Sequence, residues 1–480
     1  MNFGIDFGTT NSACVGIEDG RRAIRFTDGY GNPFPSLVII DQTTGRVFCG
    51  REAWRRREEL RESCLVINSI KTLLCSDKVW SIAGQSWTPE VVAAQVFRAL
   101  RERVEKRTGR DALRRAVVAI PVGFPAEKRV ALQNAARTAG IEVTSFVSEP
   151  TAALFCHYDE VGHNTSIGVF DWGGGTLDVS VIENRNGRVK ELSTSGMDVA
   201  GDYIDRIMAE WIHRRIVKNG GATLSLSFDE MPPDARDKML AACEQAKRDL
   251  TWDEMSEVRF LNYGRMGDVH ETIDSQSFSK LINPVVEKAL DCFNSCVHQA
   301  GLSVTQLDCI LMVGGSINLR PLSDRIASIC NGKELYPADS DWSVATGAAS
   351  LSIRPGQHFS AQTVGVTMSD GSLYPLLNAG ELIETQETIP ATFAMTEDEL
   401  AANLVFSDEE GRLLGYLNVP AFGFFREKIE VRARIDKSLI LSVEARSLNR
   451  SARTTRQWRY SGLRVDYQLP VTLLEMADDE

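Results

Sequence analysis

Two stretches of the chain share one layout that suits phosphate and metal chemistry. Residues 3–17 (FGIDFGTTNSACVGI) and 168–182 (GVFDWGGGTLDVSVI) each contain an apolar run that ends in aspartate, a short turn, and a second apolar run. The aspartates are Asp6 and Asp171, and the turns contain Gly8, Thr9, Thr10 and Asn11 in the first stretch and Gly173, Gly174, Gly175 and Thr176 in the second. The repeat indicates one structural unit that is used twice.

These turns are suited to hold a polyphosphate from two sides. A glycine-rich turn directs several backbone N–H groups into one concavity, and threonine hydroxyls add donors without blocking close approach. Asp6 and Asp171 then fit a role as holders of Mg²⁺ through water, because this cation keeps several waters and must neutralise phosphate charge. One such turn alone is weak evidence, since Asp and Gly are common in hairpins for purely conformational reasons. The repetition is what favours the nucleotide interpretation.

The segments around the turns alternate between strand and helix patterns. Apolar alternation predicts strands within 3–40, and the run at 116–124 predicts a buried strand. Thr88 as N-cap and Pro89 at the first helical position predict the start of a helix. The expected helices span 89–107, 126–139, 201–219 and 233–250, a third strand-to-glycine turn spans 308–322, and 339–350 leads into a small-residue helix. This order predicts an α/β fold with two similar halves.

The pattern changes after about residue 354. Residues 354–362 are polar and turn-rich, and the segments that follow are short alternating runs, such as KIEVRARI and LILSVEA, without a long helix. This pattern predicts a compact β domain within 360–474. The final residues, MADDE, are expected to form a solvated acidic tail.

The composition limits the classes of partner. A chain of 480 residues is long enough for two or three domains. Its net charge of -12 argues against nucleic-acid binding, because nucleic-acid binders normally present a basic face to the phosphates. The arginine-rich stretch at 51–62 mixes Arg with Glu at helical spacing, which is typical of a solvated helix. We therefore expect no nucleic-acid partner.

The sequence also carries expectations about the cellular compartment. It shows no signal-peptide pattern at the N-terminus, and no apolar run approaches the roughly 20 residues that span a bilayer. We therefore expect a cytoplasmic protein with no membrane partner. The ten cysteines are scattered without a CxxC pair, so we expect free thiols rather than disulfides or a metal site.

Six stretches of the chain resemble the seventy-kilodalton heat-shock chaperone family. They occur in the family's order and read GIDFGTTNSA, AVVAIPVGF, SEPTAALF, FDWGGGTLDVSVIE, CEQAKRDL and ILMVGGSINLRPL, within a resemblance that extends over residues 2–350. The resemblance implies an α/β actin-like, ribonuclease-H-like ATPase domain of two lobes, followed by a small β-sandwich domain. The expected boundaries are 1–353 for the ATPase domain, 354–362 for a polar linker and 363–475 for the sandwich. The chain is similar to a short, bacterial-type member without a helical lid.

The resemblance assigns roles to individual residues. Lys71 matches the family lysine that reaches the γ-phosphate and the attacking water, although a solvated helix lysine is the simpler interpretation without the resemblance. The residues implied in catalysis are Lys71, Glu149, Asp171, Thr176 and Asp178, and those implied in holding Mg²⁺, largely through water, are Asp6 and Asp171. The residues implied in binding ATP or ADP are Gly8, Thr9, Thr10, Asn11, Gly173, Gly174, Gly175, Thr176, Gly201, Asp202, Glu244, Lys247, Arg248, Thr251, Gly314, Gly315, Ser316, Asn318 and Asp341.

The chain departs from the family pattern in three places. Asn318 stands where the family commonly has an arginine that packs against adenine, which predicts a weaker adenine clamp. Ala200 replaces the first of two glycines, and its methyl group is expected to crowd the phosphates. The segment 354–362 lacks the apolar run that docks as a strand in the family, although Pro121 and Arg129, which match the family's relay between ATPase site and linker, are present.

The leading functional interpretation is a slowly hydrolysing ATPase of the chaperone type that binds unfolded or extended polypeptide. By the same resemblance, its candidate partners are a J-domain co-chaperone and a nucleotide exchange factor. Two alternatives stay open at this point. One is a nucleotide-gated regulatory or filament-forming protein, and the other is a small-molecule kinase of the same fold, which would need an aspartate base in place of Lys71.

Overall fold

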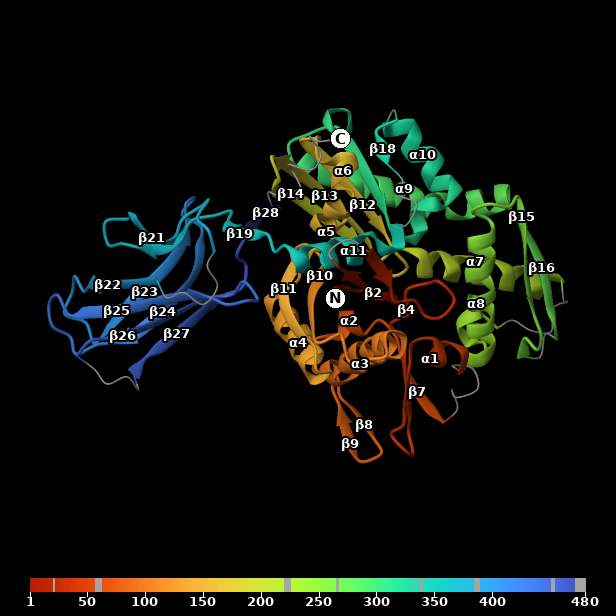
Figure 1. Ribbon diagram of the computed structural model, residues 1–480, viewed down its shortest axis with the longest axis horizontal. Helices are drawn as coiled ribbons and strands as arrows, with labels where there is room; N and C mark the ends of the chain where they lie inside the picture. Colours follow the sequence, from red (N-terminus) through yellow and green to blue (C-terminus); the bar gives the residue numbers. More distant parts are fainter. Residues whose placement is uncertain are drawn as a thin grey trace.

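The computed structural model describes residues 1–19, 22–56, 63–219, 226–264, 267–330, 332–335, 340–383, 389–449 and 454–470. A large mixed α/β body carries a smaller β domain, which lies at the left of Figure 1. The expected acidic tail lies outside the described residues, as does part of the arginine-rich stretch. No helix in the described ranges is long and apolar enough to cross a membrane.

The first half of the α/β body is built on one mixed sheet. Its strands are β1 (Asn2–Phe7), β2 (Asn11–Glu18), β3 (Arg22–Arg25), β10 (Arg115–Ile120) and β11 (Glu142–Ser148), in the order β11-β10-β1-β2-β3, with β4 (Phe34–Pro35) paired to β2. The first three strands form an antiparallel meander, and β10 and β11 continue the sheet in parallel. The first predicted turn joins β1 to β2, so its residues lie at the carboxyl end of β1.

The second half repeats this topology. Its strands are β12 (Ser166–Trp172), β13 (Leu177–Arg185), β14 (Arg188–Met197), β17 (Cys309–Val313) and β18 (Glu334–Leu335), in the order β18-β17-β12-β13-β14. Again a meander of three antiparallel strands is followed by two parallel ones. The second predicted turn joins β12 to β13, which is the position that the first turn has in its own sheet.

The helices cover the sheets and separate them. The main helices are α3 (Pro89–Thr108), α4 (Ala126–Thr138), α5 (Glu149–Cys156), α7 (Gly201–Asn219), α8 (Pro233–Asp249), α9 (Ser275–Gln299), α10 (Arg320–Cys330) and α11 (Ser340–Ile353). The helices expected from the sequence are confirmed to within one residue for α3, α4, α7 and α8. Thr88 caps α3 by accepting the backbone N–H of Val91, as its position predicts.

Helices α5 and α11 form the contact between the two halves. Residues of α5 and α11 share one buried cluster with strands of both sheets. Two glycines permit the close approach: a Cβ on Gly347 would lie 1.8 Å from the carbonyl oxygen of Ala152, and one on Gly4 would lie 2.1 Å from the backbone nitrogen of Ala349. The two halves therefore meet through backbone contacts that larger residues would prevent.

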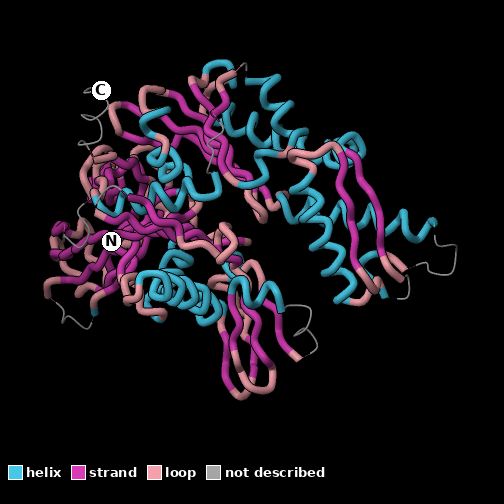
Figure 2. The backbone as a smooth tube through the Cα atoms, turned by 45° about the vertical axis from the view of Figure 1, so that its right-hand side comes forward, coloured by secondary structure: helices cyan, strands magenta, loops and turns pink. Residues whose placement is uncertain are grey.

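Smaller elements extend each half. In the first half these are α1 (Gly50–Arg56), α2 (Ile70–Leu73), a sheet of β5 (Val38–Asp41), β6 (Val47–Cys49) and β7 (Cys64–Ile67), and a hairpin of β8 (Trp80–Ile82) and β9 (Gln85–Trp87). In the second half, β15 (Met255–Phe260) and β16 (Val269–Asp274) form a hairpin beside α7 and α8, at the right edge of Figures 1 and 2. All ten cysteines are free, as expected.

The β domain consists of two four-stranded antiparallel sheets that enclose one apolar core. The sheet orders are β21-β20-β23-β24 and β22-β25-β26-β27. The strands are β20 (Val364–Thr367), β21 (Leu373–Leu377), β22 (Ile389–Ala394), β23 (Ala401–Asp408), β24 (Leu413–Pro420), β25 (Lys428–Ile435), β26 (Leu441–Ser447) and β27 (Arg456–Tyr460). Phe406 of one sheet stacks on Trp458 of the other with ring centroids 3.9 Å apart.

Both ends of the β domain return to the second sheet of the α/β body, which differs from expectation. Strands β19 (Gln357–Ser360) and β28 (Val465–Gln468) extend that sheet in the order β14-β28-β19. The expected polar linker therefore contains a strand, and residues expected in the sandwich pair with β14 instead. Tyr467 explains the attachment: its ring contacts His358, its hydroxyl accepts the backbone N–H of Gly356, and it is buried together with Val189.

The β domain also contacts the first half of the α/β body. Arg129 of α4 donates to the carbonyl oxygen of Ser461 at 3.4 Å, and Lys437 lies 3.5 Å from Glu142 of β11. Burial lowers the pKa of Arg129, and the charge of Asp436 opposes this shift. The β domain thus bridges the two halves, with two strands on one and polar contacts on the other.

We predict that Tyr467→Ala lowers the free energy of unfolding by about 3 kcal/mol, because it removes a buried aromatic ring that holds β28 and β19 together. Urea denaturation measures this loss. The matched control is Tyr416→Ala on β24, where the tyrosine is 72% exposed and truncation should cost about 0.5 kcal/mol or less. Equal losses in the two variants would contradict the attachment through β28.

Candidate functional site

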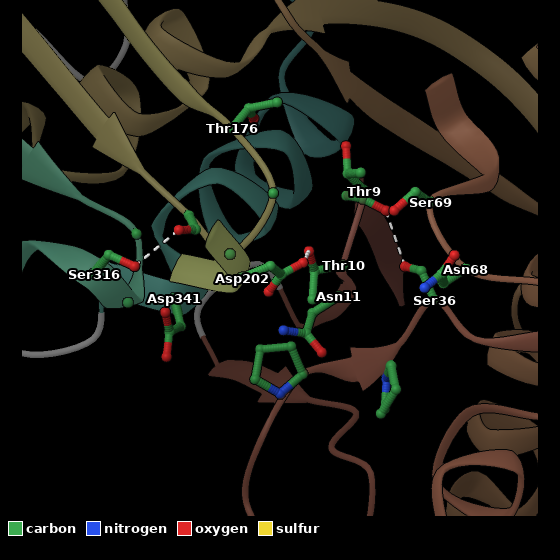
Figure 3. Close-up of a pocket in the computed structure, with 18 of the residues that line it drawn as sticks. Thr9, Thr10, Asn11, Ser36, Asn68, Ser69, Thr176, Asp202, Ser316 and Asp341 are labelled. Atoms are coloured by element: carbon green, nitrogen blue, oxygen red, sulfur yellow. Dashed lines mark hydrogen bonds between the residues drawn. The ribbon is translucent and has the colours of Figure 1, made fainter. Parts of the chain in front are cut away.

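The two hairpin turns line one cavity between the halves. The cavity has a volume of about 1130 Å³, and its walls come from both sheets, from α2, from α8 and from the start of α11. Figure 3 shows Thr9, Asn68 and Ser69 on one side and Ser316 and Asp341 on the other. A cavity of this size is at the upper end of those that hold small-molecule ligands and cofactors.

The glycines of the second turn allow it to touch the first turn. A Cβ on Gly174 would lie 3.0 Å from Oγ1 of Thr10, and one on Gly175 would lie 3.1 Å from the Thr9 side chain. Thr10 also donates its hydroxyl to Asp202 of α7 at 3.2 Å, as the dashed line in Figure 3 shows. The two turns can therefore approach this closely because Gly174 and Gly175 have no Cβ atom.

A buried ion pair lines the cavity. Nζ of Lys71 is 2.8 Å from Oε1 of Glu149, and their side chains are 7% and 10% exposed. Burial works against the charge of Lys71, but Glu149 and Asp6 outweigh it and raise the pKa of the ammonium group. Lys71 is therefore a fixed cation, rather than the solvated helix lysine of the simpler interpretation.

Three further carboxylates of the cavity, those of Asp6, Asp171 and Asp178, form no ion pair with a lysine or arginine within the described ranges. Burial, followed by the charge of Glu149, raises the pKa of Asp6 to about 7 and that of Asp178 to about 6. The same two causes raise the pKa of Asp171 well above its usual value. The site therefore carries more negative charge than its protein environment can stabilise, which is the environment that a bound cation relieves.

The donor set fits a hydrated divalent cation. Asp6 and Asp171 offer hard oxygen ligands of the kind that Mg²⁺ prefers. Within the described ranges, no group of three or more His, Cys, Asp or Glu side chains is arranged to hold a metal ion. A cation held by these two aspartates would take its remaining ligands from water.

The opposite wall of the cavity is built from α8, the third glycine turn and α11. Lys247 binds Asp205 at 2.8 Å and the carbonyl oxygen of Gly201 at 3.0 Å, so its charge is already paired. Ser316 donates to the carbonyl oxygen of Gly173 at 2.8 Å and ties the third turn to the second. Glu244 and Arg248 form an ion pair along α8 at the cavity edge.

Most of the residues expected at the site line this cavity. They are Asp6, Gly8, Thr9, Thr10, Asn11, Lys71, Glu149, Asp171, Gly173, Gly174, Gly175, Thr176, Asp178, Asp202, Glu244, Lys247, Arg248, Thr251, Gly314, Gly315, Ser316 and Asp341. Gly201 and Asn318 are not in the wall. Asn318 is exposed because it ends a 3-10 turn, and the next residue, Leu319, faces the cavity instead.

Sequence reasoning missed several residues of the site. Asp198 lines the cavity, and its charge contributes to the raised pKa of Asp178. Its position shortly before Gly201 could have indicated this. Arg320 donates to the carbonyl oxygen of Thr251 at 3.1 Å and so fixes the segment that follows α8. Asn68 and Ser69 also line the cavity, and no motif in the sequence marks them.

Comparison with known proteins identifies the family. The family model for Hsp70 protein matches residues 76–392, which is more than half of the chain. The chain therefore belongs to the Hsp70 family, and the resemblance seen in the sequence is confirmed. Members of this family are ATP-binding chaperones with ATPase activity, bind ATP or ADP with Mg²⁺, and share an actin-like fold of two lobes.

We predict that Asp6→Asn raises the melting temperature of the ligand-free protein at pH 8 by about 2 °C or more. Because the pKa of Asp6 is raised to about 7 in the folded state from its ordinary 3.8, the folded state binds more protons, so stability falls as pH rises between these values. The gain should therefore shrink as the pH falls towards 5. Calorimetric melting without Mg²⁺ measures it, with Asp77→Asn on the exposed α2–β8 connection as control. A gain that does not depend on pH would contradict the raised pKa.

Proposed function

We propose that the chain binds Mg²⁺–ATP between the two turns, hydrolyses it slowly to ADP and phosphate, and binds extended polypeptide through its β domain in the cytoplasm. In this proposal the ATPase domain comprises residues 1–353, extended by β19 and β28, and the sandwich comprises the strands between them. The observation that carries the proposal is the convergence of both turns, the Lys71–Glu149 pair and three further carboxylates on one cavity.

The turns and the carboxylates have complementary tasks in this proposal. Backbone N–H groups of both turns and the hydroxyls of Thr9 and Thr10 bind the phosphate oxygens. Asp6 and Asp171 would hold Mg²⁺ through water, and the bound cation supplies positive charge beside the phosphates. Glu244 and Arg248 face the nucleoside at the outer wall, whereas Lys247 holds the wall together through Asp205.

Hydrolysis depends on fixed charges around the terminal phosphate. A water molecule attacks the γ-phosphorus, the bond from this atom to the bridging oxygen of ADP breaks, and Lys71 stabilises the negative charge that develops. Thr176 bonds Asp178 and orients it. Asp178, whose pKa is raised to about 6, accepts the proton from the attacking water. The kinase alternative would need an aspartate base at the position of Lys71, and that position holds a lysine paired with Glu149, so we favour hydrolysis over transfer to a small molecule.

The distal end of the β domain offers a surface for polypeptide. Phe422, Phe424 and Phe425 are 50%, 48% and 62% exposed on the loop between β24 and β25. The loop is held in place by Glu427, which accepts the backbone N–H groups of Phe422 and Gly423. An ordered, exposed aromatic surface favours a role in binding. A J-domain co-chaperone and a nucleotide exchange factor are the partners that family membership suggests.

We predict that Lys71→Ala and Thr176→Ala each lower the single-turnover rate of ATP hydrolysis by about tenfold or more, which is about 1.4 kcal/mol of transition-state stabilisation. ATP affinity should change little, because both residues act on the hydrolysis step: Lys71 on the charge that develops at the terminal phosphate, and Thr176 through Asp178. A rapid-quench assay with radiolabelled ATP measures the rate. Lys106→Ala, which removes an exposed lysine of α3, is the control and should leave the rate unchanged. Wild-type hydrolysis rates in both Lys71→Ala and Thr176→Ala would contradict this mechanism.

We further predict that the nucleotide changes peptide affinity by less than about tenfold, or 1.4 kcal/mol of coupling. The β domain is attached to the second sheet by two strands, and this attachment limits how far it moves between states. Fluorescence anisotropy of a labelled apolar peptide, in ATP and in ADP, measures the coupling. The double variant Phe424→Ser/Phe425→Ser should lose peptide binding and retain hydrolysis. A nucleotide effect far above tenfold would show that the two strands do not restrain the domain.

A further inference from the structure

Glu191 makes a hydrogen-bonded contact across the two halves that the proposed mechanism does not use. It lies on β14 of the second half, where a bulge shifts the register between β13 and β14. Its Oε1 accepts the hydroxyl of Ser148 and, at 3.2 Å, that of Thr151. Both partners belong to the start of α5, which follows the first sheet directly. Bulges of this kind re-aim side chains and occur beside active sites.

The contact fixes the first turn of α5. Ser148 is the N-cap of this helix, and its Oγ accepts the backbone N–H of Thr151 at 3.2 Å. Because the same hydroxyl donates its hydrogen to Glu191, both of its hydrogen-bonding functions are used and its orientation is set. An anionic group at this end of the helix is also favoured by the helix dipole. Within the described ranges, no lysine or arginine forms an ion pair with Glu191.

The helix that Glu191 holds begins with the acid of the buried ion pair. Glu149 is the first residue of α5, is 8% exposed, and lies 2.8 Å from Lys71. We propose that Glu191 is a positioning residue for ATP hydrolysis: through Ser148 and Thr151 it fixes the start of α5 and thereby the place of Glu149 and Lys71. This inference rests on the proposed function. It adds a residue from the opposite half that does not line the cavity and that contacts the start of α5.

Four variants test this role. Glu191→Leu removes the acceptor and keeps the bulk, Glu191→Gln keeps a carbonyl acceptor, and Ser148→Ala removes the N-cap hydroxyl. The fourth variant combines Glu191→Leu with Ser148→Ala. Glu183→Leu is the matched control, because Glu183 lies on β13 of the same sheet and pairs with Arg185 away from the cavity.

We expect Glu191→Leu and Ser148→Ala each to lower the single-turnover hydrolysis rate by about tenfold, with the nucleotide dissociation constant within about twofold of wild type. Glu191→Gln should stay within about threefold of wild type, and the control should be unchanged. The combined variant should be no slower than either single variant, because both changes interrupt one route. A merely structural role would lower thermal stability without this non-additive effect on the rate.

Three results would overturn the inference: a Glu191→Leu rate within about twofold of wild type, an equal loss in Glu191→Gln, or fully additive losses in the combined variant. Hydrogen exchange separates this inference from the proposed function. The amide of Thr151 should exchange about tenfold faster in Glu191→Leu than in wild type, whether or not the protein hydrolyses ATP. An unchanged exchange rate of the Thr151 amide would reject the positioning role. Faster exchange in Glu191→Leu, if the wild-type protein shows no ATP hydrolysis, would reject only the proposed ATPase function.

Discussion

The ion pair between Lys71 and Glu149 sets the electrostatic conditions of the whole site. Burying two charges is costly, and a pair of this kind persists only when the surrounding structure holds both partners in place. One lysine stands beside Glu149 and three further partly buried carboxylates, so negative charge remains in excess. Loss of solvation, followed by the charge of Glu149, raises the pKa values of Asp6 and Asp178. A cation bound together with a polyphosphate would relieve this excess of negative charge.

The architecture explains how this costly arrangement is maintained. Lys71 and Glu149 come from α2 and α5, and α5 is wedged between the two halves by the close approach of Gly347 to Ala152. The β domain adds a second connection, because its two end strands extend the second sheet while Arg129 and Lys437 contact the first half. Movement of the halves around a ligand therefore involves α5 and the β domain together. The β domain is thus attached by two strands and by polar contacts, and not by a single flexible linker.

Local signals predicted much of the structure, and non-local pairing limited the rest. The Asp–Gly–Thr turns, the Thr88 cap and the apolar runs specify the repeated halves, and nearly all expected site residues line the cavity. The attachment of β28 was not predictable, because a four-residue strand has no pattern that identifies a partner far along the chain. Asn318 lies outside the cavity wall, at the end of the 3-10 turn Gly315–Asn318, and its sequence position alone does not reveal this turn. Glu191 went unnoticed, since a single acid on a strand has no motif around it.

In the proposed function, a cation that arrives with the nucleotide completes the carboxylate cluster. Isothermal titration calorimetry of Mg²⁺–ATP at pH 7, repeated in buffers with different ionisation enthalpies, measures the protons exchanged on binding. Because Asp6 and Asp178 titrate near pH 7 and pH 6 in the ligand-free protein, a bound cation should lower their pKa values and release protons. We expect net proton release that disappears when a chelator removes Mg²⁺. Proton uptake, or equal affinity and no release with and without Mg²⁺, would contradict it.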